Sequence, residues 1–195
     1  LFRSSAASDV YKRQGYMTRK TQRDWFTAGI HLLAEQGIIS LKIDTLTKRL
    51  GVTKGSFYHH FQNYQDYKTK LLEFIMEEGT LQIIQLTDEV HTPEARLNRL
   101  LEITTGHPPD LEVALRAWAL QDAQVRQHQT KIDERRIAYV RDIFAELGHN
   151  EIRALQMAQL LYAVYIGCQQ ILPPIQETDL QKLYFEMMPL LLQNA

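Results

Sequence analysis

Polar side chains suited to nucleic-acid contact cluster in residues 53–60, which read TKGSFYHH. Lys54 could bind a phosphate or a guanine edge, and Ser56 and His59 could read base edges. Gly55 has no side chain, so the backbone there could approach a ligand closely. This combination of a cation, hydroxyl and imidazole groups and a glycine, within about two helical turns, is a candidate surface for contact with DNA.

Two short helical patterns joined at Gly51 must position these side chains, in the stretch IDTLTKRLGVTKGSFYHHF. Gly51 permits a backbone angle that costs other residues about 1 kcal/mol or more. Thr53 stands as the N-cap of the second helix, where its hydroxyl could satisfy an amide and contribute about 1 kcal/mol. The apolar residues that can pack the two helices at a steep angle are Ile43, Leu46, Leu50, Val52, Phe57 and Phe61. This layout predicts a helix-turn-helix whose second helix enters the major groove.

The charge of the chain is divided unevenly along its length, although the net charge is only −1. Residues 17–72 carry nine lysines and arginines against four acidic residues, which gives +5. Residues 73–195 carry ten against eighteen, which gives −8. A basic N-terminal third followed by an acidic remainder indicates a DNA-binding head on a body that does not bind DNA.

The rest of the chain has apolar residues at helical spacing and no strand alternation, so the predicted fold class is all-α with about nine helices. A first helix is expected from about 21 to 36, and a longer one from about 65 to 87. Thr92 and Pro93 begin another helix, which ends near residues 107–110, where the next one begins. The last three helices are expected over about 123–147, 151–172 and 179–193.

Other classes of function find little support in the sequence. No apolar run approaches the roughly 18 residues needed to cross a bilayer, so no membrane partner is expected. The single cysteine, Cys168, cannot form an intramolecular disulfide and is expected to be buried. The seven histidines lack the spacing of metal ligands, so neither a metal nor a cofactor is expected. No catalytic motif is present, and an all-α enzyme stays an alternative. Asp133 and Glu134 are expected to pair with the neighbouring Arg135, Arg136 or Arg141, or to face solvent.

The opening residues, LFRSSAASDVYKRQGY, differ from the rest of the chain. They lack the apolar stretch of a signal peptide, and helical periodicity begins only after Met17. We therefore expect Met17 to be the natural start and residues 1–16 to be a non-native or disordered tail. A short basic arm that reaches into a minor groove is the alternative.

The first helix, the segment GVTKGSFYHHF and the longer helix after it resemble the DNA-binding domain of the TetR family of bacterial transcriptional regulators. The resemblance covers residues 18–75 closely and the later helices more loosely, including the segments LRAWALQDAQVRQ and DIFAELG. It implies that the Tyr58 hydroxyl binds a phosphate. Lys42 and Thr45, at the start of the preceding helix, are further candidates for phosphate contacts.

The chain departs from the pattern of this family at two positions. Thr47 stands where the family usually has alanine, at the contact between the two helices. Tyr64 stands where a phosphate-binding lysine often follows the closing phenylalanine. A tyrosine hydroxyl can still bind phosphate, so Tyr64 is kept as a candidate DNA contact, but it carries no charge.

The resemblance also implies a division into a head at residues 17–64 and an effector-binding and dimerisation body at residues 65–195. The middle helices are expected to enclose a small-molecule effector, with packing in the core or a surface ion pair as the alternative. The candidate effector residues are Leu115, Arg116, Trp118, Tyr139, Phe144 and Tyr162. The last two helices are expected to pair with their copies across a twofold axis, with packing inside one subunit as the alternative. The candidate dimer residues are Leu155, Tyr165, Leu183 and Met187.

These expectations combine into a homodimeric, ligand-responsive transcriptional regulator of the cytoplasm, and not an enzyme. Its simplest form is a repressor that a small molecule releases from a palindromic operator in double-stranded DNA. The main alternative is a helical binding module or orphan sensor that keeps the head without regulated DNA recognition. The basic head and the intact segment at residues 53–58 argue against that alternative.

Overall fold

The computed structural model describes residues 20–106 and 108–192, so the expectation about residues 1–16 lies outside the described residues. Helices fill the described part of the chain, and it contains no strand. The helices are α2 (Gln22–Gln36), α3 (Ile43–Leu50), α4 (Lys54–His60), α5 (Tyr64–Met76), α6 (Gln82–Asp88), α7 (Pro93–Thr105), α8 (Asp110–Ala119), α9 (Ala123–Glu146), α10 (Glu151–Gln170) and α11 (Glu177–Leu192), with a short 3-10 turn η1 (Ile38–Ser40).

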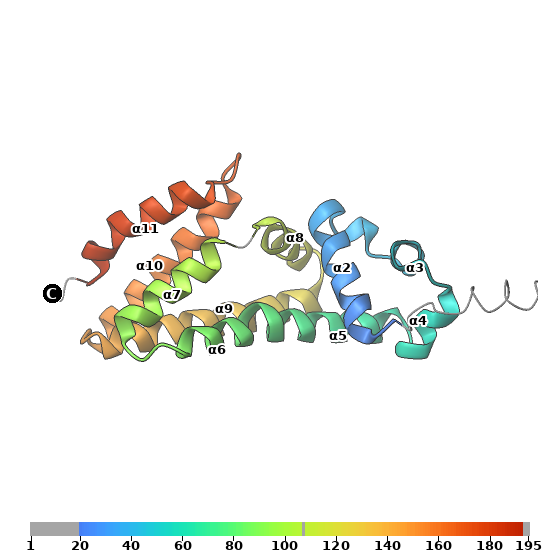
Figure 1. Ribbon diagram of the computed structural model, residues 1–195, viewed down its shortest axis with the longest axis horizontal. Coiled ribbons are helices and arrows are strands. Elements are labelled where there is room, and N and C mark those ends of the chain that lie inside the picture. Colours follow the sequence, from blue (N-terminus) through green and yellow to red (C-terminus); the bar gives the residue numbers. More distant parts are fainter. Residues whose placement is uncertain (1–19, 107, 193–195) are drawn as a thin grey trace, which may run out of the picture.

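A π turn, η2 (Glu77–Leu81), joins α5 to α6 without a break, and we call this continuous rod at residues 64–88 the linker helix. Counted this way, the described residues form nine continuous helices, which confirms the predicted all-α fold. Among them, none is long and apolar enough to cross a membrane. Figure 1 shows the small helices α2–α4, the head, at one end of the molecule and α10 and α11 toward the other, with the linker helix and α9 running between them.

Side-chain caps explain where most of these helices begin. Thr21 forms a capping box with Asp24 at the start of α2. The Asn63 side chain accepts from the Asp66 amide at the start of α5, 2.9 Å away, and the Asn150 side chain does the same for α10. Each such cap satisfies an amide that the helix itself leaves unpaired and contributes about 1 kcal/mol. The starts of these helices are therefore determined largely by residues close by in the sequence.

The turn between α3 and α4 depends on Gly51, which adopts φ 66° and ψ 35°. This is the left-handed region, which residues with a side chain enter only at an energetic cost. Beside the turn, the Thr47 side chain is buried and its hydroxyl donates to the Asp44 carbonyl at 3.0 Å. The polar residue at this helix contact is thus satisfied by its own helix, so the departure from alanine leaves the turn intact.

Two hydrophobic cores hold the molecule together. The first core joins the head to α5 and also takes in residues of α8 and α9: Leu115, Trp118, Ala119, Val125 and Ile132. The second core lies among α7, α9, α10 and α11 and includes the buried Cys168, whose thiol pKa is raised by burial. Because the first core crosses residue 64, the head is packed onto the body and its position depends on the turn between α8 and α9.

Candidate nucleic-acid interface and effector cavity

The apolar side of α4 is locked into the head by aromatic side chains. Phe57 is fully buried, with its ring edge-to-face against Trp25 at a centroid distance of 5.4 Å. Phe61, directly after α4, packs edge-to-face against Tyr67 of α5, and the Tyr67 hydroxyl donates to the Trp25 carbonyl at 3.1 Å. Such aromatic pairs add about 0.5–1.5 kcal/mol beyond burial. The orientation of α4 is consequently fixed.

The opposite side of α4 is open to solvent and carries the predicted DNA contacts. Lys54, Gly55, Tyr58 and His59 are exposed, and Ser56 is half-buried. Tyr58 keeps 56% of its surface exposed, although its ring packs edge-to-face against Phe57. A large aromatic residue held at the surface by a buried neighbour presents its hydroxyl outward in a defined position.

Lys54 forms an exposed ion pair with Asp44 of α3, with 2.7 Å between Nζ and Oδ1. The hydrogen bond to the Asp44 carboxylate raises the pKa of Lys54, so the lysine keeps its charge. Exposed pairs of this kind contribute little to stability. A DNA phosphate can therefore replace Asp44 as the partner of Lys54 at small cost.

Thr53 is the N-cap of α4 by position, but its hydroxyl makes no capping hydrogen bond, so the predicted side-chain cap is wrong. The Ser56 amide pairs with the Thr53 carbonyl instead, at 3.0 Å. The exposed hydroxyl is left available to a phosphate at the helix start. Lys42 is exposed at the start of α3, while Thr45 is half-buried one turn further on.

Tyr64 differs from the other predicted DNA contacts because it is half-buried at the start of α5 and packs against the first core. Burial, followed by the nearby Asp122 carboxylate, raises the pKa of its hydroxyl. Tyr64 lies where the linker helix meets the start of α9, whose N-cap is Asp122. As a DNA contact, Tyr64 stays a prediction.

Lys68 and Asp122 join the linker helix to the turn between α8 and α9. The buried Lys68 ammonium pairs with the Asp122 carboxylate and lies 5.7 Å from the centre of the Trp118 ring. The hydrogen bond from Lys68 lowers the pKa of Asp122. Close by, Gln124 donates to Thr69 at 2.8 Å. These contacts tie the head to the body through charge as well as apolar packing.

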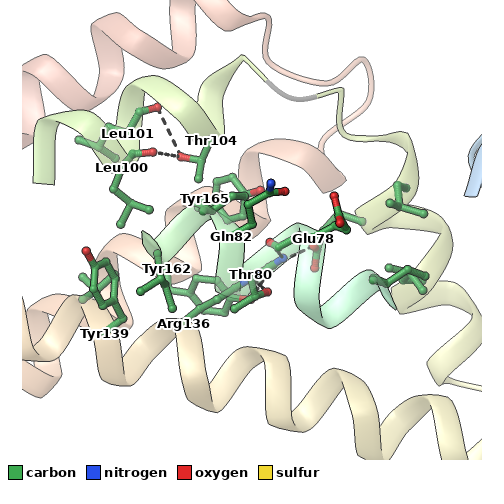
Figure 2. A pocket seen from close by; sticks show the side chains of 18 of the residues that line it. Glu78, Thr80, Gln82, Leu100, Leu101, Thr104, Arg136, Tyr139, Tyr162 and Tyr165 are labelled. Carbon is green, nitrogen blue, oxygen red and sulfur yellow. Dashed lines mark hydrogen bonds and ion pairs between the residues drawn. The ribbon is translucent and has the colours of Figure 1, made fainter. Parts of the chain in front are cut away.

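A cavity of about 380 Å³ opens in the body beside the linker helix. Its wall is largely aliphatic and is contributed by the linker helix and by α7, α8, α9, α10 and α11 (Figure 2). Three of the predicted effector residues, Leu115, Tyr139 and Tyr162, line it. The Tyr139 hydroxyl donates to Asp88 at 2.6 Å, which leaves the ring as its main contribution to the wall.

Two charged residues of the wall, Glu112 and Arg136, belong to a network of half-buried charges. Arg136 pairs with Glu112 at 2.9 Å, and Glu112 also pairs with Arg116 at 2.8 Å. Arg116 is bidentate on Asp133, which also accepts from the Tyr162 hydroxyl at 2.8 Å. The expectation that Asp133 pairs with the neighbouring Arg136 is thus wrong. Asp133 pairs with Arg116 and Arg136 pairs with Glu112, both of α8, because α8 packs directly against α9.

The other three predicted effector residues do not line the cavity. Arg116 lies behind the wall in the charge network, Trp118 is buried in the first core, and Phe144 is buried in the second core against the His149 ring. The structure places Glu112 and Arg136 on the wall, and neither is among the effector residues predicted from the sequence. The spacing of four residues between Glu112 and Arg116 on one helix was the available signal.

The predicted dimer residues separate into two groups. Leu155 and Leu183 are exposed on α10 and α11, near further exposed apolar side chains such as Ile152 and Phe185. Tyr165 instead lines the cavity, and Met187 is half-buried against the second core. The outer faces of α10 and α11 therefore remain the candidate surface for a partner copy.

Comparison with known proteins agrees with the helix-turn-helix. Residues 26–66 match the bacterial regulatory proteins of the tetR family. The transcriptional regulator AcuR of Cereibacter sphaeroides is 44% identical over 46 residues, which make up 24% of this chain and 21% of that protein. The chain therefore spans about a fifth of the length of this curated relative.

Over most of its length the chain is similar to solved structures in fold alone. A transcriptional regulator of the TetR/AcrR family is 20% identical with a TM-score of 0.76, over 88% of this chain and 98% of its own. A regulator from Saccharomonospora viridis, solved in complex with choline, is 14% identical with a TM-score of 0.72, over 86% of this chain and 95% of its own. The chain therefore shares the fold of these structures and carries a helix-turn-helix in its head. The match to the tetR family of bacterial regulatory proteins covers residues 26–66, which span most of the head and the start of α5.

Proposed function

We propose that this chain is a homodimeric repressor that binds a palindromic operator and is released from it by a small-molecule effector. The head proposed at residues 17–64 would read the DNA, and the body at residues 65–195 would bind the effector and the partner copy, in the cytoplasm. The proposal is supported chiefly by the orientation of α4. The buried Phe57 fixes its apolar side, while Lys54 and Tyr58 face solvent. Selection of bound sequences from random duplex DNA tests it, because a twofold dimer enriches a palindrome.

A dimer is supported by the exposed leucines and aromatic residues of α10 and α11. Ile152, Phe185 and Leu190 are each well over half exposed, which is costly for a surface that stays in water. Pairing these helices with their copies would bury the apolar surface and place two heads on one side of the assembly. Two recognition helices could then lie about one helical turn of DNA apart, roughly 34 Å.

The wall of the cavity favours an uncharged, mainly apolar effector. Among the described residues that line it, each charged side chain already has a partner: Glu78 is held by Arg23, and Glu112 and Arg136 hold each other. A charged ligand would lose its water without gaining a free counter-charge, which costs several kcal/mol. The relative crystallised with choline, a cation, shows that the fold can also hold a charged ligand.

Three ligands that share a phenylalkyl scaffold test this preference: benzylacetone, which is uncharged, phenylbutyrate, an anion, and phenylbutylamine, a cation at neutral pH. We expect titration calorimetry to show benzylacetone binding at least about tenfold more tightly than either charged analogue, equivalent to about 1.4 kcal/mol. Tighter binding of the amine would contradict the proposed preference and indicate a cation site like that of the choline-bound relative.

A further inference from the structure

The linker helix changes its hydrogen-bond register beside the cavity. In the π turn at Glu77–Leu81, the Gln82 amide bonds to the Glu77 carbonyl, five residues back. The partner in an α-helix is four residues back. Where the helix returns to the α register, one backbone carbonyl receives no hydrogen bond from an amide of the helix. If that carbonyl is buried, it needs a donor from elsewhere. Single π turns of this kind occur often at functional sites.

Arg136 of α9 supplies donors to this turn from outside the helix. Its Nη2 donates to the Gly79 carbonyl at 3.1 Å, and its Nε donates to the Thr80 hydroxyl, also at 3.1 Å. Thr80 is almost completely buried, so its hydroxyl has little access to water. Figure 2 shows Arg136 beside Thr80. Two charge-assisted bonds thus converge on the segment whose register is unusual.

A further donor of Arg136 points to two other helices that line the cavity, α8 and α10. Nη1 donates to Glu112 of α8 at 2.9 Å and to the Tyr162 hydroxyl of α10 at 3.5 Å. One guanidinium therefore ties the linker helix to α8 and α10, and it is itself part of the cavity wall. A ligand in the cavity lies against the group that holds the π turn.

The consequence for the head follows from helix geometry. Adding or removing one residue from the register turns the helix by about 100° and moves it by about 1.5 Å along its axis, and packing absorbs part of this. The first half of the linker helix is built into the core of the head. A π-to-α change at η2 would therefore displace the head relative to the body, and it provides two discrete arrangements.

We propose that Arg136 holds the linker helix in its π register and is the residue through which a ligand in the cavity shifts that register. This inference rests on the proposed ligand-responsive function, to which it adds the residue and the structural change. When a ligand draws the guanidinium away from Gly79, the π turn loses its outside donor and the α register becomes favoured. The ligand acts by its different affinity for the two arrangements.

Amide hydrogen exchange of the full chain tests the role of Arg136. Arg136→Lys keeps a charge for Glu112 but cannot also reach Gly79 and Thr80, so we expect exchange at residues 77–85 to accelerate about five- to tenfold, as the loss of one or two hydrogen bonds predicts. The matched control is Arg141→Lys on the same helix, where the exposed arginine pairs with the adjacent Asp142. Exchange in α2 serves as the internal reference, and Thr80→Val, which removes one acceptor with little change in shape, should give a smaller acceleration in the same segment.

The proposal would be overturned if both Arg136→Lys and Thr80→Val exchanged at residues 77–85 at rates within about twofold of the Arg141→Lys control. A second arm adds benzylacetone: it should change exchange in this segment of the wild-type chain, and not in Arg136→Lys. An equal change in both proteins would overturn the coupling role. If the wild-type chain selects no DNA sequence, the proposed function fails, while the exchange comparison still decides whether Arg136 holds the turn.

Discussion

At the scale of single residues, the candidate DNA surface depends on side chains whose present partners are easily exchanged. Lys54 is held by Asp44 in an exposed pair, and the Thr53 hydroxyl has no role in capping α4. Residues that stabilise the fold behave differently, since Asn63 caps α5 with its side chain. The head thus separates side chains that build the helix-turn-helix from those left for a ligand.

Lys54→Ala should weaken binding to random-sequence duplex DNA and reduce its dependence on salt. A lysine that neutralises one phosphate contributes about 0.9 to the slope of log affinity against log salt concentration. Fluorescence anisotropy at several salt concentrations measures that slope. The control is Lys182→Ala at α11, where an exposed lysine also pairs with an aspartate, Asp179, at 2.9 Å. Equal slopes for the two variants would remove Lys54 from the interface.

At the scale of elements, the first half of the linker helix belongs to the first core, and Lys68 is its charged contact with the α8–α9 turn. Lys68→Met leaves Asp122 without its partner and should lower the free energy of unfolding by about 1–2 kcal/mol at neutral pH. Chemical denaturation measures this change. Lys70→Met is the control, because the ion pair of Lys70, with Asp66, lies within one helix.

The same pair predicts how this stabilisation depends on pH. The pKa of Asp122 is lowered in the folded chain, so the unfolded state binds its proton first as the pH falls. The contribution is complete above the unfolded pKa of about 3.9 and is lost as the pH falls through the lower, folded value. The difference in unfolding free energy between wild type and Lys68→Met should therefore be constant from about pH 6 to 5 and shrink below about pH 4. A difference that grows on acidification would contradict the assignment.

Elements whose boundaries are set by nearby residues could be predicted from the sequence. Thr92 before Pro93 begins α7, and Gly51 ends α3, because caps and turns act within a few residues. Phe57 and Phe61 are buried as their spacing indicates. The exposed surface of α4 followed from the same periodicity.

Contacts between residues far apart in the chain could not be predicted in this way. Arg136 reaches Gly79 across 57 positions, and no local pattern marks the pair. Trp118 has the spacing of a residue facing the middle of the body, yet it packs with the head because α8 crosses α2. Tyr165 lies on a helix that is apolar on more than one side, so periodicity could not decide between the cavity and a partner copy.

At the scale of the whole molecule, the proposed function requires two copies that meet through α10 and α11. Leu155→Glu would place a charge on each side of a twofold interface, so the dissociation constant of the dimer should rise at least about a hundredfold. Sedimentation velocity measures the change. The control is Leu120→Glu, an equally drastic substitution at a leucine 77% exposed beside α8, away from these helices. A dimer that dissociates equally with both variants, or with neither, would place the interface elsewhere.

The basic head, the acidic body and the fold support the proposed arrangement, in which two exposed α4 helices would read two half-sites of one operator. The most direct measurement is selection of bound sequences from random duplex DNA by the full chain at near-physiological salt. A twofold dimer should enrich a palindrome whose half-site centres lie about 10 base pairs, or a small multiple of that spacing, apart. Weak binding that depends on salt and enriches no sequence would contradict it.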